Sequence, residues 1–382
     1  MPALQLLIKP ASGLCNMQCK YCFYSDITSK RETASYGIMT LETLEEVIKK
    51  ALSYADYTCG FAFQGGEPTL AGLDFFKSVV DLQKKYNAKN LNIQNSIQTN
   101  GYIIDEEWCR FFHDNHFLVG LSVDGIKATH DSYRKASGDK DTFWQIMNAA
   151  SLFKEMEVEY NILTVVHRKT AAKVRKIYEF YKKNGFSYQQ YIACLDPVFE
   201  RQGEEEYSLT PEAYGEFLKE LFDLWYIDLQ WERQPYIRQF ENYVAILMGY
   251  QPESCEQRGT CGIQYVVEAD GEVYPCDFYV LDEYKLGNLK ECDFPDIDER
   301  RKEIEFIQSS FNHDEECRRC PYFSLCRGGC ARHRTELSDR EDPSKMEGKR
   351  NYFCRSYRMF FEHSADRLQD IAYKIKEKEK GR

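Results

Sequence analysis

Three cysteines lie close together near the start of the chain, in the run CNMQCKYC that covers residues 15–22. Three thiolates with this spacing can bind three irons of a four-iron, four-sulfur cube, which usually takes four cysteines, so one iron keeps an open position. A structural zinc ion would instead require four ligands and no open position. The run follows the short apolar segment Leu4–Lys9, so it places a functional loop after a first predicted strand. It favours an iron–sulfur site whose open iron binds and activates a cofactor.

The bulk composition excludes several classes of function. The chain has 382 residues, which is enough for two domains, and a hydrophobic share of 43% supports a real interior. A net charge of −11 without a basic stripe disfavours a nucleic-acid partner. No apolar run reaches the roughly 18 residues of a membrane span, and no secretory signal is present, so we expect no membrane partner and a cytoplasmic location. Fifteen cysteines in a reducing compartment indicate metal ligands rather than disulfides.

Short apolar segments alternate with amphipathic segments along the first half of the chain. Thr40 is typical of a helix start, and Asn184-Gly185 of a helix end. The predicted strands are Leu4–Lys9, Cys59–Gln64, Leu91–Thr99, Phe117–Val123, Val158–Val166 and Tyr188–Ala193. The predicted helices are Leu41–Tyr54, Leu73–Tyr86, Glu106–Asn115, Thr142–Met156 and Lys173–Lys183, followed by Pro211–Leu229. Six strands alternating with helices predict parallel βα units that form an open, partial barrel.

Polar motifs follow four of these strands: Gln64–Pro68, Gln98–Gly101, Ser122–Gly125 and Cys194–Pro197. Functional loops of parallel α/β architectures lie beyond the carboxyl ends of the strands. The alternative is that these are ordinary turns rich in Gly and Pro. Because all four would converge with the cysteine loop, we favour a shared site.

A second group of cysteines begins at residue 255. Cys261 and Cys276 flank a segment in which Asp270-Gly271 predicts a β-hairpin, and the hairpin would bring the two cysteines together. The run CRRCPYFSLCRGGC at residues 317–330 alone resembles a zinc ribbon or knuckle. Without Cys292, which lies outside every motif, the eight other cysteines of this half equal two complete four-thiolate sets. Spacing does not decide which cysteine belongs to which set, although local proximity would group those of residues 317–330.

Three segments together resemble a known family. The segments CNMQCKYCFY at 15–24, FAFQGGEPTL at 61–70 and YPCDFY at 274–279 are similar to those of anaerobic sulfatase-maturating enzymes, and the first is typical of radical S-adenosylmethionine enzymes. The resemblance implies a partial (β/α)6 barrel over residues 1–235 and a SPASM domain with a C-terminal helix over residues 236–382. It implies three 4Fe-4S clusters, S-adenosylmethionine, and oxygen-independent oxidation of a sulfatase Cys or Ser to Cα-formylglycine.

The same resemblance distributes the cysteines among the clusters. It gives the first cluster Cys15, Cys19 and Cys22. It gives one auxiliary cluster Cys255, Cys261, Cys276 and Cys330, and the other Cys317, Cys320, Cys326 and Cys354. Four cysteines outside every motif receive no role: Cys59, Cys109, Cys194 and Cys292.

Asp277 is the candidate catalytic base, because it is adjacent to the predicted ligand Cys276 and a base must reach the proton that it takes. The alternative is a surface aspartate or one that caps the hairpin. For S-adenosylmethionine the resemblance implies Tyr21, Gly66, Ser122, Arg134 and Leu195. Among these, glycine permits a close backbone approach and arginine suits the methionine carboxylate. Further candidates for contact with the substrate peptide or the cofactor are Tyr24, Gln64 and Gln98.

The family implies a sulfatase polypeptide with a Cys/Ser-x-Pro-x-Arg motif as partner, and an electron donor such as flavodoxin or ferredoxin. Only fourteen residues precede Cys15, so we expect no winged-helix domain for a leader peptide, and we expect a monomer. Another SPASM enzyme, which forms thioethers or epimerises peptides, would share every cluster cysteine. A zinc-binding interaction protein is the alternative from a different class. The choice between Cys-type and Ser-type sulfatases, and the identity of the reductant, stay open.

Overall fold

The computed structural model describes residues 3–334 and 350–380, which fall into two compact units. The first unit contains the chain up to residue 123 together with residues 130–161 and 263–304. The second contains residues 124–129 and 162–262 and the chain from residue 305 onward. Within the described residues, no helix has the length and apolar character needed to cross a membrane.

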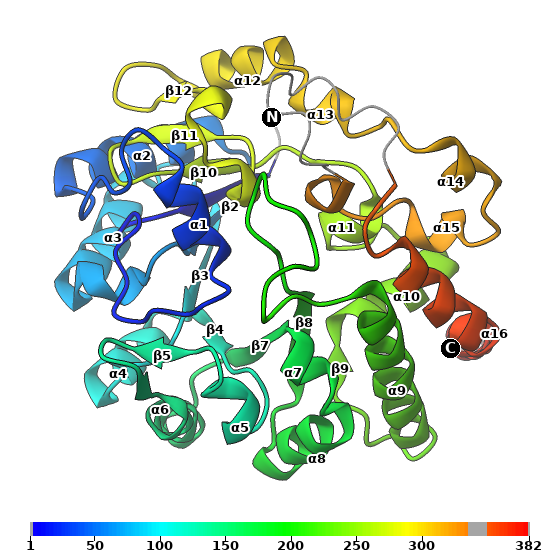
Figure 1. Cartoon of the computed structure of the whole chain (residues 1–382). Helices are drawn as coiled ribbons and strands as arrows, with labels where there is room; N and C mark the ends of the chain where they lie inside the picture. Colours follow the sequence, from blue (N-terminus) through cyan, green and yellow to red (C-terminus); the bar gives the residue numbers. More distant parts are fainter. Residues whose placement is uncertain (1–2, 335–349, 381–382) are drawn as a thin grey trace. The chain divides into compact units, whose positions relative to one another are not determined.

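A mainly parallel sheet forms the centre of the first unit (Figure 1). Its strand order is β12 (Gly287–Asn288), β11 (Glu272–Tyr274), β10 (Tyr265–Val267), β1 (Leu4–Ile8), β2 (Thr58–Phe63), β3 (Asn92–Thr99) and β4 (Leu118–Ser122). Neighbours from β10 to β4 are parallel, whereas the hairpin of β10 and β11 is antiparallel, as Asp270-Gly271 predicts. Sequence patterns did not predict that β10 pairs with β1, with Leu6 opposite Tyr265.

Amphipathic helices connect these strands. The helices and short elements of this part are α1 (Phe23–Ser29), α2 (Leu41–Tyr54), η1 (Pro68–Ala71), α3 (Leu73–Tyr86), α4 (Glu106–Asp114), β5 (Lys135–Ala136), β6 (Lys140–Asp141), α6 (Phe143–Glu155), η2 (Asp277–Tyr279), η3 (Asp282–Tyr284) and α12 (Phe294–Glu303). The short helix α5 (Lys127–His130) belongs to the second unit except for its last residue. Thr40 caps α2 as predicted, since its Oγ1 accepts a hydrogen bond from the Thr43 amide at 3.1 Å. Buried rings of Phe63, Phe76 and Trp108 pack between the sheet and the helices.

The second unit combines three parallel strands with a helical layer. Its strands are β7 (Tyr160–Val166), β8 (Tyr188–Ala193) and β9 (Tyr236–Ile237). Its helices are α7 (Arg168–Ala171), α8 (Val174–Asn184), α9 (Pro211–Leu229), α10 (Arg238–Met248), α11 (Cys255–Arg258), α13 (Phe306–Ser309), α14 (Glu315–Arg319), α15 (Phe323–Cys326), η4 (Ala331–Arg334) and α16 (Cys354–Lys380). Helices α9, α10 and α16 pack through Phe222, Phe240 and Phe360, whose rings are 5.3–5.8 Å apart.

The predicted elements agree closely with the structure. All six strands and six helices expected from periodicity are present, and each end lies within two residues of the prediction. The sequence analysis did not predict α1 or α10, and it identified α16 only as a C-terminal helix without bounds. Gly185 ends α8 in the left-handed conformation with φ 74°, as expected for a glycine C-cap.

Candidate active site

The cysteine loop leaves β1 and is fixed by backbone hydrogen bonds before α1 begins. The amides of Gln18 and Lys20 donate to the carbonyls of Lys135 and Tyr133, at 2.7 and 3.1 Å. Cys15 is exposed, and its two partners in the motif are partly exposed, so the thiols are accessible. Within residues 3–334 and 350–380, no three His, Cys, Asp or Glu side chains are close enough to hold one metal ion.

Two side-chain N–H donors point at the sulfur atoms of this loop, in addition to the backbone amides of Met17 and Ser25. Asn100 Nδ2 lies 3.8 Å from Cys15 Sγ, and Arg134 Nη1 lies 3.9 Å from Cys19 Sγ. Donors of this kind tune the potential of iron–sulfur clusters through the ligand sulfurs. The donor set and the accessible thiols therefore fit an iron–sulfur cluster held by the three cysteines.

The glycine turn after β2 lies directly against the cysteine loop. A Cβ atom at Gly66, whose φ is +54°, would come within 2.1 Å of the Leu14 carbonyl oxygen. The Glu67 amide donates to the same carbonyl at 2.8 Å. A Cβ atom at Gly65, whose φ is +115°, would lie 2.7 Å from Cγ of Lys9. Both positions thus require glycine, and the neighbours that impose this are the cysteine loop and Lys9.

Glu67 ties this turn to the end of β3. Glu67 is 1% exposed, and its carboxylate accepts four hydrogen bonds of 2.7–3.1 Å. Oε1 accepts from the amide and the hydroxyl of Thr69 and from the hydroxyl of Thr99. Oε2 accepts from the amide of Asn100. Burial raises the pKa of Glu67, while these donors act in the opposite direction. From the sequence, Glu67 was only part of the Gln64–Pro68 motif and had no role of its own, although a glutamate before Pro68 is a visible candidate for such a cap.

The predicted cofactor residues Tyr21, Gly66, Ser122 and Arg134 all lie in the first unit, whereas Leu195 belongs to the second. The Arg134 guanidinium lies over the Tyr21 ring, 5.6 Å from its centroid, and both side chains are buried. Gln98 Nε2 donates to Ser122 Oγ at 3.0 Å, which joins the ends of β3 and β4. Leu195 is half-buried after β8.

Asp277 opens the short helix η2 directly after Cys276, and it is 9% exposed. Oδ1 forms an ion pair with Lys9 Nζ, and Oδ2 accepts a hydrogen bond from Gln64 Nε2 at 2.8 Å. The surface-aspartate alternative is therefore not what the structure shows. In the sequence, Lys9 was only the last residue of a predicted strand. The one available signal of a special role was that this lysine ends an apolar run directly before a proline.

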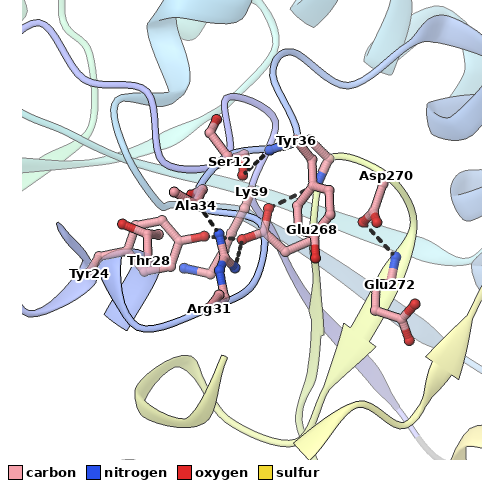
Figure 2. A network of polar contacts seen from close by, with 12 residues as sticks. Lys9, Ser12, Tyr24, Thr28, Arg31, Ala34, Tyr36, Glu268, Asp270 and Glu272 are labelled. Atoms are coloured by element: carbon pink, nitrogen blue, oxygen red, sulfur yellow. Dashed lines mark hydrogen bonds and ion pairs between the residues drawn. The ribbon is translucent and has the colours of Figure 1, made fainter. Parts of the chain in front are cut away.

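Behind this pair lies a buried network of polar side chains (Figure 2). The Lys9 ammonium stands 3.7 Å from the centroid of the Tyr24 ring. The Tyr24 hydroxyl donates to Glu268 Oε1, which also pairs with Arg31 Nη1 at 2.7 Å. Burial, followed by the charge of Glu268, raises the pKa of Tyr24 well above its ordinary value, so its hydroxyl stays protonated as a donor.

The remaining predicted ligands fall in both units. Cys276 is in the first unit, and the other seven, at positions 255, 261, 317, 320, 326, 330 and 354, are in the second. Burial raises the pKa of the Cys326 thiol to about 12, and the charges of Cys354, Cys317 and Cys320 act in the same direction. These four thiols are therefore neighbours.

Cys330 has different neighbours, although it is close to Cys326 in sequence. Burial raises the pKa of its thiol, and the charges of Cys255, Glu256 and Cys261 raise it further. Cys330 therefore interacts with Cys255 and Cys261, while the assignment of all eight cysteines to two clusters stays a prediction.

Comparisons with known proteins agree with this geometry. Residues 10–181 match the model of the radical SAM superfamily, and residues 255–321 match that of the SPASM iron–sulfur cluster-binding domain. A cysteine-type anaerobic sulfatase-maturating enzyme from Clostridium perfringens is 50% identical over 98% of this chain and 100% of the relative. A serine-type enzyme from Bacteroides thetaiotaomicron is 32% identical over 95% of this chain and 89% of the relative.

Solved structures give the same result. The structure described as native anSMEcpe with bound AdoMet and Kp18Cys peptide superposes with a TM-score of 0.92 at 48% identity, covering 98% of this chain and 100% of that one. The match confirms the predicted fold class, an α/β radical S-adenosylmethionine partial barrel followed by a SPASM domain.

Proposed function

We propose that this chain, which belongs to the family of anaerobic sulfatase-maturating enzymes, acts on sulfatases whose target residue is cysteine. It is an oxidoreductase that uses S-adenosylmethionine and iron–sulfur clusters and converts a sulfatase residue to formylglycine without oxygen. The cysteine preference is supported by relatives from two Clostridium species, which are named cysteine-type and are 46–50% identical, against 32% for a serine-type relative. A sulfatase-derived peptide is the partner, and its Cys-x-Pro-x-Arg motif is part of the proposal.

When bound, S-adenosylmethionine and three 4Fe-4S clusters supply a 5′-deoxyadenosyl radical that removes a hydrogen atom from Cβ of the target, and an acceptor for the remaining electron. The loop at residues 15–22 holds the first cluster, while Asn100 and Arg134 donate toward its sulfurs. Tyr21, Gly66, Ser122, Arg134 and Leu195 would bind the cofactor, and the guanidinium would pair with the carboxylate of its methionine group.

Asp277 takes the thiol proton in this scheme. After Cβ has lost a hydrogen atom, loss of the thiol proton and one electron leaves a carbon–sulfur double bond. Water then replaces sulfur and gives the aldehyde and hydrogen sulfide. The observation that carries the assignment is the orientation of the Asp277 carboxylate, which is held by Lys9 and Gln64 directly after the predicted ligand Cys276. The carboxylate is an acceptor with lone pairs left for the substrate.

The test is anaerobic turnover of a Cys-x-Pro-x-Arg peptide by Asp277→Asn. We expect 5′-deoxyadenosine to form while formylglycine falls by about 100-fold, since a general base contributes about 10²–10⁴ in rate. Asp270→Asn changes an aspartate in the turn of the same hairpin, where it accepts from the Glu272 amide at 3.1 Å, and should keep full product. Full product from Asp277→Asn would remove it from the mechanism. Deoxyadenosine with an unchanged peptide in the wild type would move the substrate to another peptide class.

The electron donor, flavodoxin or ferredoxin, the monomeric state, the cytoplasmic location and the domain boundary near residue 235 stay predictions. The zinc-binding alternative is tested by colour, because a reconstituted iron–sulfur protein absorbs broadly in the visible range and a zinc protein is colourless. The same preparation provides the iron and sulfide content on which the count of three clusters depends.

A further inference from the structure

Lys9 is a fully buried lysine at the end of β1. Its side chain is 0% exposed, and its amide donates to the Val267 carbonyl at 2.8 Å, which fixes its backbone against β10. A buried ammonium is strongly unfavourable unless a charge and hydrogen bonds compensate it. The neighbouring carboxylate of Glu268 is already bound to Arg31, to the Tyr24 hydroxyl and to the Ala269 amide (Figure 2). The counter-charge of Lys9 is therefore Asp277.

The two oxygens of Asp277 are held from two different strands. Lys9, at the end of β1, binds Oδ1, and Gln64, after β2, binds Oδ2. A carboxylate has about four acceptor positions for hydrogen bonds. Two donors therefore fix its plane and still leave positions at which it can accept the substrate proton. An isolated carboxylate on a three-residue helix would rotate about its side-chain bonds. Here the two contacts select one orientation.

Lys9 also shapes the loop that carries Gln64. Its aliphatic stem occupies the space of a Cβ atom at Gly65, with Cγ and Nζ only 2.7 and 2.8 Å from that position. The Tyr24 ring lies against the ammonium from the other side, 3.7 Å from its centroid. The lysine is thus enclosed by a glycine turn, an aromatic face and a carboxylate. Its position is determined by packing as well as by charge.

We infer that Lys9 is a positioning residue for the oxidation, which acts through Asp277 by holding its carboxylate where it can take the thiol proton. This inference rests on the proposed function. Removal of hydrogen from Cβ does not need this carboxylate, whereas the following proton loss does. Changing Lys9 should therefore separate the two steps, since a misplacement of about 1 Å can cost about 100-fold in rate.

The experiment uses reconstituted enzyme, S-adenosylmethionine and a Cys-x-Pro-x-Arg peptide that carries deuterium at Cβ of the cysteine. For Lys9→Met we expect deuterium in 5′-deoxyadenosine as in the wild type, and a formylglycine-to-deoxyadenosine ratio that falls by about 10- to 100-fold. Lys50→Met is the matched control: this lysine of α2 pairs with Asp293 at 3.1 Å, and its replacement should keep the wild-type ratio. A wild-type ratio in Lys9→Met overturns the inference.

A double-variant cycle separates positioning from a structural role. If Lys9 acts through Asp277, Lys9→Met should change the ratio little in an Asp277→Asn background. Equal losses in both backgrounds contradict the inference. If Lys9→Met fails to load its clusters, Gln64→Leu is the second variant, because it removes the other hydrogen-bond donor to Asp277 at a partly exposed position. A wild-type formylglycine-to-deoxyadenosine ratio in Gln64→Leu overturns the inference. Absence of formylglycine from the wild type in the same assay would contradict the proposed function instead.

Discussion

Glu67→Gln should weaken the glycine turn, because Glu67 is the buried carboxylate that links this turn to the end of β3. Replacement by glutamine keeps the shape of the side chain but exchanges one acceptor oxygen for an NH2 donor. Oε1 accepts three hydrogen bonds and Oε2 accepts one, from the Asn100 amide at 2.8 Å. The amide group of glutamine will therefore place its carbonyl toward the two threonines and its NH2 against the Asn100 amide. Two donors then face each other in a buried site.

The magnitude follows from that lost bond. A buried donor left without an acceptor costs about 1–3 kcal/mol. Loss of the negative charge also weakens the remaining hydrogen bonds. In the opposite direction, a neutral amide costs less to bury than a carboxylate, and the same burial cost raises the pKa of Glu67. We expect a net cost of about 2 kcal/mol. If all of it appeared in cofactor binding, the affinity for S-adenosylmethionine would fall about 30-fold, since about 1.4 kcal/mol corresponds to tenfold.

Two measurements on the reconstituted protein test this reasoning. Anaerobic equilibrium dialysis with labelled S-adenosylmethionine gives the dissociation constant, and thermal unfolding at a fixed scan rate gives the apparent midpoint. For a domain of 150–250 residues, about 2 kcal/mol lowers the midpoint by about 4–8 °C. Thr99→Ser keeps the hydroxyl that donates to Glu67 and should change neither quantity. A Glu67→Gln variant with an unchanged dissociation constant and midpoint would refute the argument.

Two further predictions address backbone conformation and helix capping. Gly66→Ala should abolish binding of S-adenosylmethionine in the same dialysis assay, because its Cβ would lie 2.1 Å from the Leu14 carbonyl oxygen. Gly185→Ala is the control, because Gly185 also has a positive φ but faces open space. It should keep cofactor binding and lower the stability in thermal unfolding by only about 1–2 kcal/mol. Thr40→Ala should lower the stability of the protein by about 1 kcal/mol in denaturant unfolding. Thr40→Ser keeps the cap of α2 and should not lower it. Equal stability of the two variants would contradict the capping role.

Local elements were predictable because local chemistry determines them. Periodicity located the strands and helices, Thr40 marked the start of α2, and Asp270-Gly271 marked the turn between β10 and β11. The pairing of β10 with β1 was not predictable in this way. It joins residues about 260 positions apart, as Leu6 and Tyr265 show, and the apolar pattern of either strand would fit several neighbours.

The candidate site shows the same division. The motif of Cys15, Cys19 and Cys22 and the position of Asp277 after Cys276 are visible in the sequence because ligand spacing and adjacency are local. Contacts of Asp277 with side chains 213 and 268 positions away are not visible. Spacing also left the auxiliary ligand sets open, and the crossed arrangement stays a prediction.

The pairing of β1 with β10 brings the hairpin that precedes the predicted base next to the strand that ends in its lysine partner. Because β10 is parallel to β1, the chain leaves both strands at the same edge of the sheet, and Lys9 and Val267 are joined there by a backbone hydrogen bond. β11 then returns antiparallel and ends at Tyr274, two residues before Cys276. Cys276 and Asp277 follow β11 in one short segment, and Asp277 forms an ion pair with the lysine that ends β1. Changes that loosen this pairing should therefore affect proton removal and the auxiliary cluster together, whereas Lys9→Met should affect proton removal alone.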